Sequence, residues 1–103
     1  MCTWILHQAD VRGSGKGQTG WFPIQQANVA FDHPADAPLD HAVLIDFVNE
    51  AMGPAARVAV ELSAASARNL VAAIQHALDD GEKQHVADEQ EAAALSVRST
   101  FLN

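Results

Sequence analysis

The chain has 103 residues, a formal net charge of −7 and only six Lys and Arg residues. This length allows one hydrophobic core and no second domain, and a domain of this size buries only about two-thirds of the surface that its unfolded chain exposes. The six basic residues are widely spread, which excludes a nucleic-acid partner, because binding a phosphate backbone needs clustered positive charge.

Location is predicted from what the sequence lacks. No apolar run reaches the length of a membrane span, and the first residues lack the basic start and continuous apolar stretch of a signal peptide. The single cysteine, Cys2, cannot form an internal disulfide, which is typical of a reducing compartment. These features predict a cytoplasmic protein with no membrane partner.

The first third of the chain predicts two strands. Thr3 to Val11 is rich in β-favouring residues and predicts the first strand. Four glycines between Gly13 and Gly20 favour positive φ angles and predict a long hairpin loop. Apolar and polar residues alternate from Ile24 to Asp32, which predicts a second strand whose core-facing set is Gln25, Ala27, Val29 and Phe31.

The middle of the chain predicts two further strands. Pro34 and Pro38 break the pattern after the second strand, because neither can donate a ladder hydrogen bond. His41 to Glu50 alternates again but is partly apolar on both faces, which suits a strand that a partner subunit also covers. After a short turn, Arg57 to Leu62 predicts the fourth strand.

A helix follows the fourth strand. Ser63 is a suitable N-cap, since its hydroxyl can accept an amide hydrogen of the first turn. Apolar residues then recur at helical spacing at Ala67, Leu70, Val71, Ile74 and Leu78. Asp79-Asp80-Gly81 predicts the end of the helix. The remaining residues, 82–103, form an acidic, Ala-rich tail that is either a short helix or disordered.

Together these elements predict an α+β fold. We expect a four-stranded antiparallel meander with one C-terminal helix packed on one face, formed by a single domain of residues 1–81 and followed by the tail. The predicted core packs these side chains together: Val29, Phe31, Ile45, Phe47, Val58, Val60, Leu70 and Ile74.

Several short motifs carry a family resemblance. They are Met1-Cys2-Thr3, Gly13-Ser14-Gly15-Lys16-Gly17, Phe31-Asp32-His33-Pro34 and Asp46-Phe47-Val48-Asn49-Glu50. The chain resembles, over roughly residues 1 to 78, a group of small actinobacterial proteins described only as a domain of unknown function. The resemblance implies a single compact domain, and it carries no activity, cofactor or catalytic residue to this chain.

The densest set of reactive side chains surrounds the break between the second and third strands. Closing this hairpin predicts that two imidazoles and a carboxylate converge near one edge of the sheet. The candidate catalytic residues are His33, His41 and Asp46, and the candidate metal ligands are Asp32, His33 and His41. Such a set can bind a divalent transition metal or act as a general acid and base. The same residue types are also common in turns and on surfaces.

Two other features suggest chemistry less directly. The glycines near Lys16 could cradle an anion, although they lack the spacing of a Walker loop and precede a strand instead of a helix. Cys2 would become an amino-terminal nucleophile if Met1 were removed. The alternatives are an ordinary hairpin loop and an inert thiol.

Two functions therefore stand as hypotheses. The first is a small soluble homo-oligomeric protein, a homodimer, that binds a protein or small-molecule partner without chemistry. The second is a small enzyme that uses the His and Asp residues of the 32–46 hairpin, with or without a transition metal, for acid–base or metal-assisted chemistry.

Overall fold

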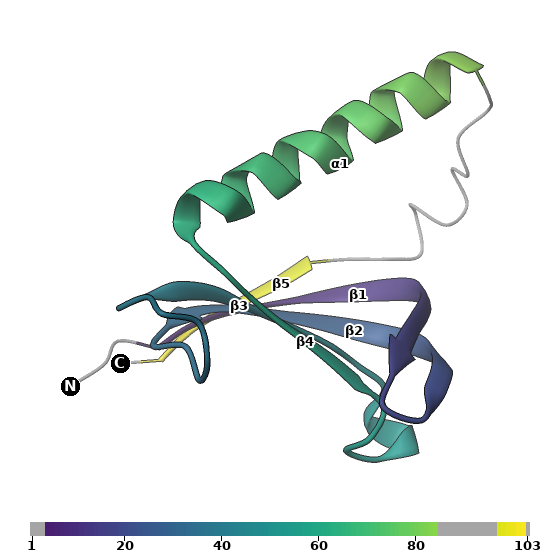
Figure 1. The fold of residues 1–103 in the computed structure, drawn as a ribbon. Helices are drawn as coiled ribbons and strands as arrows, with labels where there is room; N and C mark the ends of the chain where they lie inside the picture. Colours follow the sequence, from purple (N-terminus) through teal and green to yellow (C-terminus); the bar gives the residue numbers. More distant parts are fainter. Residues whose placement is uncertain (1–3, 85–96, 103) are drawn as a thin grey trace.

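The computed structural model describes residues 4–84 and 97–102. The elements in chain order are β1 (Trp4–Gly17), β2 (Gly20–Asp32), β3 (Ala42–Val48), a 3-10 turn η1 (Glu50–Met52), β4 (Arg57–Leu62), α1 (Ala64–Gln84) and β5 (Val97–Leu102). Figure 1 shows one layer of strands with α1 on one side of it. The predicted α+β fold, with a four-stranded antiparallel meander followed by one helix, is confirmed.

The sheet contains one strand more than the meander. Its order is β4-β3-β2-β1-β5, and each neighbouring pair is antiparallel. β5 lies within the predicted tail, in which we expected a short helix or disorder, and it covers the free edge of β1. Residues 85–96 of the tail lie outside the described residues.

The register divides the side chains of β2, β3 and β4 between two faces. Val29 pairs with Ile45, which in turn pairs with Val60, and the same face continues on either side of this row. We call it the apolar face, and its members are Ala27, Val29, Phe31, Val43, Ile45, Phe47, Val58, Val60 and Leu62. The opposite face is mixed: polar side chains such as Asn28, Asp46 and Glu61 lie among apolar ones such as Leu44 and Val48. The predicted sharing of one face by the strand members of the core is confirmed.

The predicted glycine loop is wrong, because most of it is strand. β1 continues to Gly17 and β2 begins at Gly20, so only two residues form the turn, and the register shifts between Asp10 and Gly13. The glycines allow close approach: a Cβ on Gly15 would come within 2.8 Å of the Ile24 side chain. Sequence patterns could not distinguish this crowding from loop freedom, because both favour glycine.

The helix begins as predicted and ends later. The Ser66 amide donates to Ser63 Oγ at 3.1 Å, which confirms Ser63 as the N-cap. The predicted stop at Gly81 is wrong, since α1 continues to Gln84. Gly81 does not have a positive φ angle, so it stays in the helix instead of terminating it.

The core is open on the apolar face. Among the described residues, the buried hydrophobic side chains are Phe22, Ala27, Ala42 and Ala56, so only one of them is large. Leu70 and Ile74, which we expected in the core, are 42% and 53% exposed. The reason is the angle of α1: it begins near β3 and β4 and then rises away from the sheet (Figure 1).

Candidate functional site

The loop between β2 and β3 holds two histidine rings against each other. Asp32, the last residue of β2, pairs with Ala42, the first residue of β3, which places both ends of the loop together. The His33 and His41 ring centroids are 4.6 Å apart, with planes tilted by 35°. The structure therefore brings the two imidazoles of the sequence-predicted site into contact.

A backbone contact sets the orientation of one ring. His33 Nδ1 lies 2.8 Å from the Asp40 carbonyl oxygen, and because that oxygen can only accept, Nδ1 carries the proton. In the neutral form of this ring, the other nitrogen, Nε2, is the acceptor. On the far side of the pair, Phe31 stacks on His41 with centroids 5.8 Å apart and planes within 12°.

The predicted carboxylates do not join this pair of rings. Asp32 Oδ1 accepts the backbone amide of His33 at 2.7 Å. Asp46 pairs across the sheet with Asn28 and Ala59, on the face opposite Phe31 and, four residues beyond Ala42, about 13 Å along the strand from its start. Its Oδ1 instead accepts Arg57 Nε at 3.0 Å and Nη2 at 2.8 Å.

The separation of Asp46 follows from strand alternation. Odd-numbered positions of β3 share the face of Phe31, which stacks on His41, and Asp46 is an even one. Within residues 4–84 and 97–102, no group of three or more His, Cys, Asp and Glu residues could hold a metal ion. Metal binding and acid–base catalysis by the histidines stay predictions. Cys2 lies outside the described residues.

A glutamate that sequence reasoning missed fixes this loop. Glu61 on β4 accepts the amides of Ala35 at 2.6 Å, Asp36 at 2.9 Å and Ala37 at 2.8 Å. Backbone hydrogen bonds, the one from Ala37 foremost, lower the pKa of the Glu61 carboxyl below its ordinary value. No sequence signal connects a strand glutamate with amides about 25 residues away.

A second polar group is held inside the fold, near the opposite end of β3. Asn49 is buried, and its Nδ2 donates to the Pro23 carbonyl at 2.9 Å. Its Oδ1 has no hydrogen-bond partner among the described residues. Because its amide nitrogen must face the Pro23 carbonyl, the assignment of the two ends of the side chain is settled. Asn49 thereby ties η1 to the start of β2.

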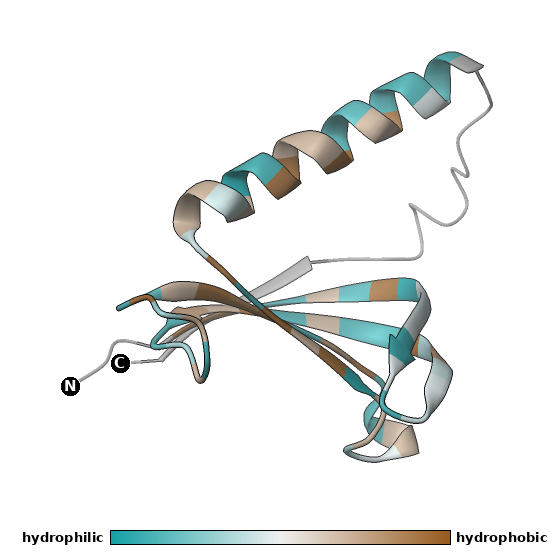
Figure 2. Ribbon diagram, viewed as in Figure 1, coloured by the Kyte–Doolittle hydropathy of each residue, from teal (hydrophilic) through white to brown (hydrophobic). Residues whose placement is uncertain are grey.

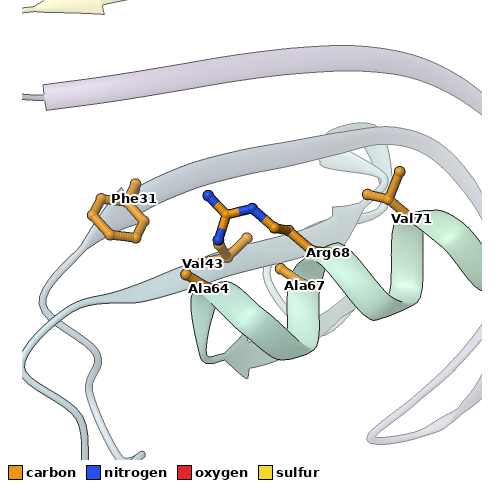
Figure 3. Close-up of a pocket in the computed structure, with 6 residues that line it drawn as sticks. All are labelled: Phe31, Val43, Ala64, Ala67, Arg68 and Val71. Carbon is orange, nitrogen blue, oxygen red and sulfur yellow. The ribbon is translucent and has the colours of Figure 1, made fainter.

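A groove lies near the histidines, between the apolar face and the start of α1. Figure 3 shows Phe31 and Val43 on the sheet side, with Ala64, Ala67, Arg68 and Val71 on the helix side. The groove has a volume of about 410 Å³. Because Phe31 also stacks on His41, the groove and the histidine pair are neighbours on one sheet face.

The helix continues the apolar lining of this groove beyond the sheet. The four large apolar residues of α1 are all substantially exposed: Leu70 42%, Val71 68%, Ile74 53% and Leu78 55%. We call these four residues the helix stripe. Figure 2 shows hydrophobic residues recurring along the length of α1 between hydrophilic ones. A partner of largely apolar surface would fit against the stripe and the groove together.

Within the part of the chain that the structure describes, no helix is long and apolar enough to cross a membrane.

Comparisons with known proteins give one match, to a family model. No curated protein and no solved structure matches the chain. The model of a family of unknown function, DUF6295, matches residues 1–88, which confirms the predicted membership in such a family, whereas an actinobacterial origin stays a prediction. The chain belongs to this family of unknown function, DUF6295.

Proposed function

We propose that the protein is a small, cytoplasmic, homo-oligomeric binding protein whose basic unit is a homodimer. The observation that carries this proposal is the exposure of the helix stripe, from Leu70 at 42% to Val71 at 68%, above an apolar sheet face that is only partly covered. Monomeric proteins seldom expose such a continuous apolar surface, whereas subunit interfaces commonly do.

The energetics favour covering this surface. Fully burying a large aliphatic side chain contributes about 1.5–3 kcal/mol, so burying the exposed part of four half-exposed ones contributes roughly 4 kcal/mol per copy. Two copies would gain roughly 8 kcal/mol, which is comparable to the cost of association. Contact between the two stripes alone is therefore marginal, and the partner must also cover part of the apolar face.

A second copy of the chain suits the surface better than an unrelated partner. Each copy carries both a helix stripe and an incompletely covered apolar face, so one twofold arrangement covers both surfaces on both copies. A thin core gives a further reason, because only Phe22 among the large apolar side chains of the described residues is buried. The domain gains stability by pairing.

Light scattering after size exclusion tests the proposal. At micromolar concentration we expect a mass about twice the chain mass of 11.0 kDa, with and without residues 97–103. Ile74→Glu should give a monomer, because it places charge within the stripe, whereas Asn69→Glu, on the opposite side of α1, should not. A wild-type protein of monomeric mass would refute the dimer.

A second candidate is metal-assisted or acid–base chemistry at the histidine pair. It is supported by the 4.6 Å ring separation and by the contact of His33 Nδ1 with the Asp40 carbonyl, which directs Nε2 of the neutral ring toward a ligand role. Elemental analysis of untagged protein tests the metal. Stoichiometric zinc, iron or manganese that is lost in the His33→Ala, His41→Ala variant would support this reading, and equal trace amounts in both proteins would contradict it.

A further inference from the structure

We infer that the groove at the start of α1 binds a small carboxylate with an apolar body, and that Arg68 holds the carboxylate. This inference deepens the binding part of the proposed function, on which it rests, by naming a class of small-molecule ligand. Three observations carry it: the apolar lining of the groove, an arginine in that lining with no acidic partner among the described residues, and the end of α1 that meets the groove.

The groove has the size and the lining of a small-molecule site. Its volume of about 410 Å³ lies within the range of about 300–1,000 Å³ that is typical of ligand pockets. Phe31 and Val43 form its sheet side, and Ala64, Ala67 and Val71 form most of its helix side. All five belong to one copy, and of the helix stripe only Val71 lines the groove. A ligand there would leave most of the stripe available for a second copy.

Arg68 is the one charged side chain among the described residues that line the groove. Figure 3 shows it extending from α1 toward Phe31 and Val43 on the sheet side. The chain holds 13 acidic residues and six basic ones, so an acidic partner is easily supplied, as Asp46 is for Arg57. Arg68 forms no ion pair with another described residue. Its guanidinium therefore offers a ligand paired N–H donors in the geometry that matches a carboxylate.

The groove also meets the positive end of the helix dipole. Ala64, which lines the groove, is the first residue of α1, and the first turn holds no acidic residue that would offset the dipole. Arg68 follows one turn later, where a cation gains nothing from the dipole. Both contributions favour an anion at this end of the groove. A single guanidinium matches the single charge of a carboxylate, whereas a phosphate dianion would keep unpaired charge.

Two probe acids test the ligand class. Octanoate represents aliphatic carboxylates and 2-naphthoate represents aromatic ones. Titrating either acid into the isotope-labelled full chain should shift the NMR signals of the Val43, Ala64 and Ala67 amides until they saturate, and should leave Met52, near the other end of β3, unchanged. Octylammonium should shift none of them, because it would place a second cation beside Arg68. The tighter acid identifies the type of apolar body, and failure of both acids to bind would overturn the inference.

Arg68→Gln tests the anchor. Because an exposed ion pair contributes modestly, octanoate binding should weaken about three- to fivefold. Binding of octan-1-ol, which has no charge, should stay as it is in the wild type. Lys83→Gln is the matched control, since it removes the same charge from the far end of α1, and it should keep the wild-type affinity for octanoate. Equal affinity of the wild type and Arg68→Gln for octanoate would overturn the role of Arg68.

Ala67→Leu tests the place of binding. The larger side chain fills the groove but remains a good helix former, so octanoate affinity should fall about tenfold or more while the urea midpoint stays close to that of the wild type. Ala73→Leu is the matched control, because its position is about 200° of helical rotation beyond Val71 and faces away from the groove. Wild-type affinity in a folded Ala67→Leu variant would overturn the groove as the site.

Light scattering on the same samples separates this inference from the homodimer. A dimeric protein that binds neither acid would overturn the ligand and leave the homodimer in place. A monomeric protein that binds octanoate through Arg68 would refute the homodimer and leave the ligand in place. Octanoate that shifts only Leu70, Ile74 and Leu78, and not the groove, would show binding to the helix stripe and would overturn the groove site.

Discussion

Glu61 joins the loop between β2 and β3 to the edge strand β4. One carboxylate accepts three successive backbone amides, those of Ala35, Asp36 and Ala37. Hydrogen bonds to the charged form favour that form, which is why the pKa of Glu61 is lowered from its ordinary value of 4.5. The loop that presents His33 and His41 is therefore held by a charge on another strand.

Replacing Glu61 with Gln should loosen this loop. The amide keeps the shape but offers a single accepting oxygen and no charge, so the exchange of the Ala35–Ala37 amide hydrogens should become faster and the urea midpoint should fall. Hydrogen exchange followed by NMR measures the first effect. Glu50→Gln, which removes the same charge without touching the loop, is the control and should leave these amides protected.

The pH dependence follows from the direction of the pKa shift. A lowered folded-state pKa means that Glu61 stabilises the fold fully above its unfolded value and loses this contribution as pH falls through the folded value. The stability difference between wild type and Glu61→Gln should thus be constant near neutral pH and shrink below about 4.5. A difference that persists unchanged at pH 3 would show that the charge of Glu61 is not responsible.

At the scale of single residues, the sequence predicted half of the candidate site. Hairpin closure correctly implied that His33 and His41 approach each other, because both flank the same pair of strand ends. Asp46 could have been excluded from the site on sequence alone, because successive side chains of a strand point to opposite faces and Asp46 precedes Phe47. Glu61 could not have been found, since its partners are backbone amides, which every residue type offers.

Among the elements, α1 shows how local signals differ in reliability. Its start was predictable because an N-cap serine makes a specific local hydrogen bond, here from the Ser66 amide to Ser63 Oγ. Its end was not, because Gly81 can either terminate a helix or remain within one. The helix period likewise indicated an apolar stripe, but not whether this chain or another would cover it.

Ser63→Ala tests the energetic role of the cap. Loss of the N-cap hydrogen bond should cost about 1 kcal/mol, which is read from the urea midpoint at fixed protein concentration. Ser66→Ala is the matched control, because its side chain only accepts from the Ser63 hydroxyl and its amide remains to be capped. Equal losses in the two variants would mean that the contact between hydroxyls, and not the cap, stabilises α1.

For the molecule as a whole, the meander was predictable and the fifth strand was not. Neighbouring strands β1 to β4 follow from alternation and short connections, and consecutive strands commonly pair. β5 instead pairs residues from opposite ends of the chain, such as Ile5 with Phe101. Six residues next to an acidic, Ala-rich stretch give too little periodicity to predict a strand, and β1 offers the edge that receives it.

The pairing of β1 with β5 brings the two ends of the chain together at one edge of the sheet. Trp4 is the register partner of Leu102, so their Cα atoms are about 5 Å apart, and Figure 1 shows β5 beside β1. The backbone is therefore suited to circular permutation. A short linker could connect the end of β5 at Leu102 with the start of β1 at Trp4, and new ends could open at the exposed Gln18-Thr19 turn without interrupting any strand.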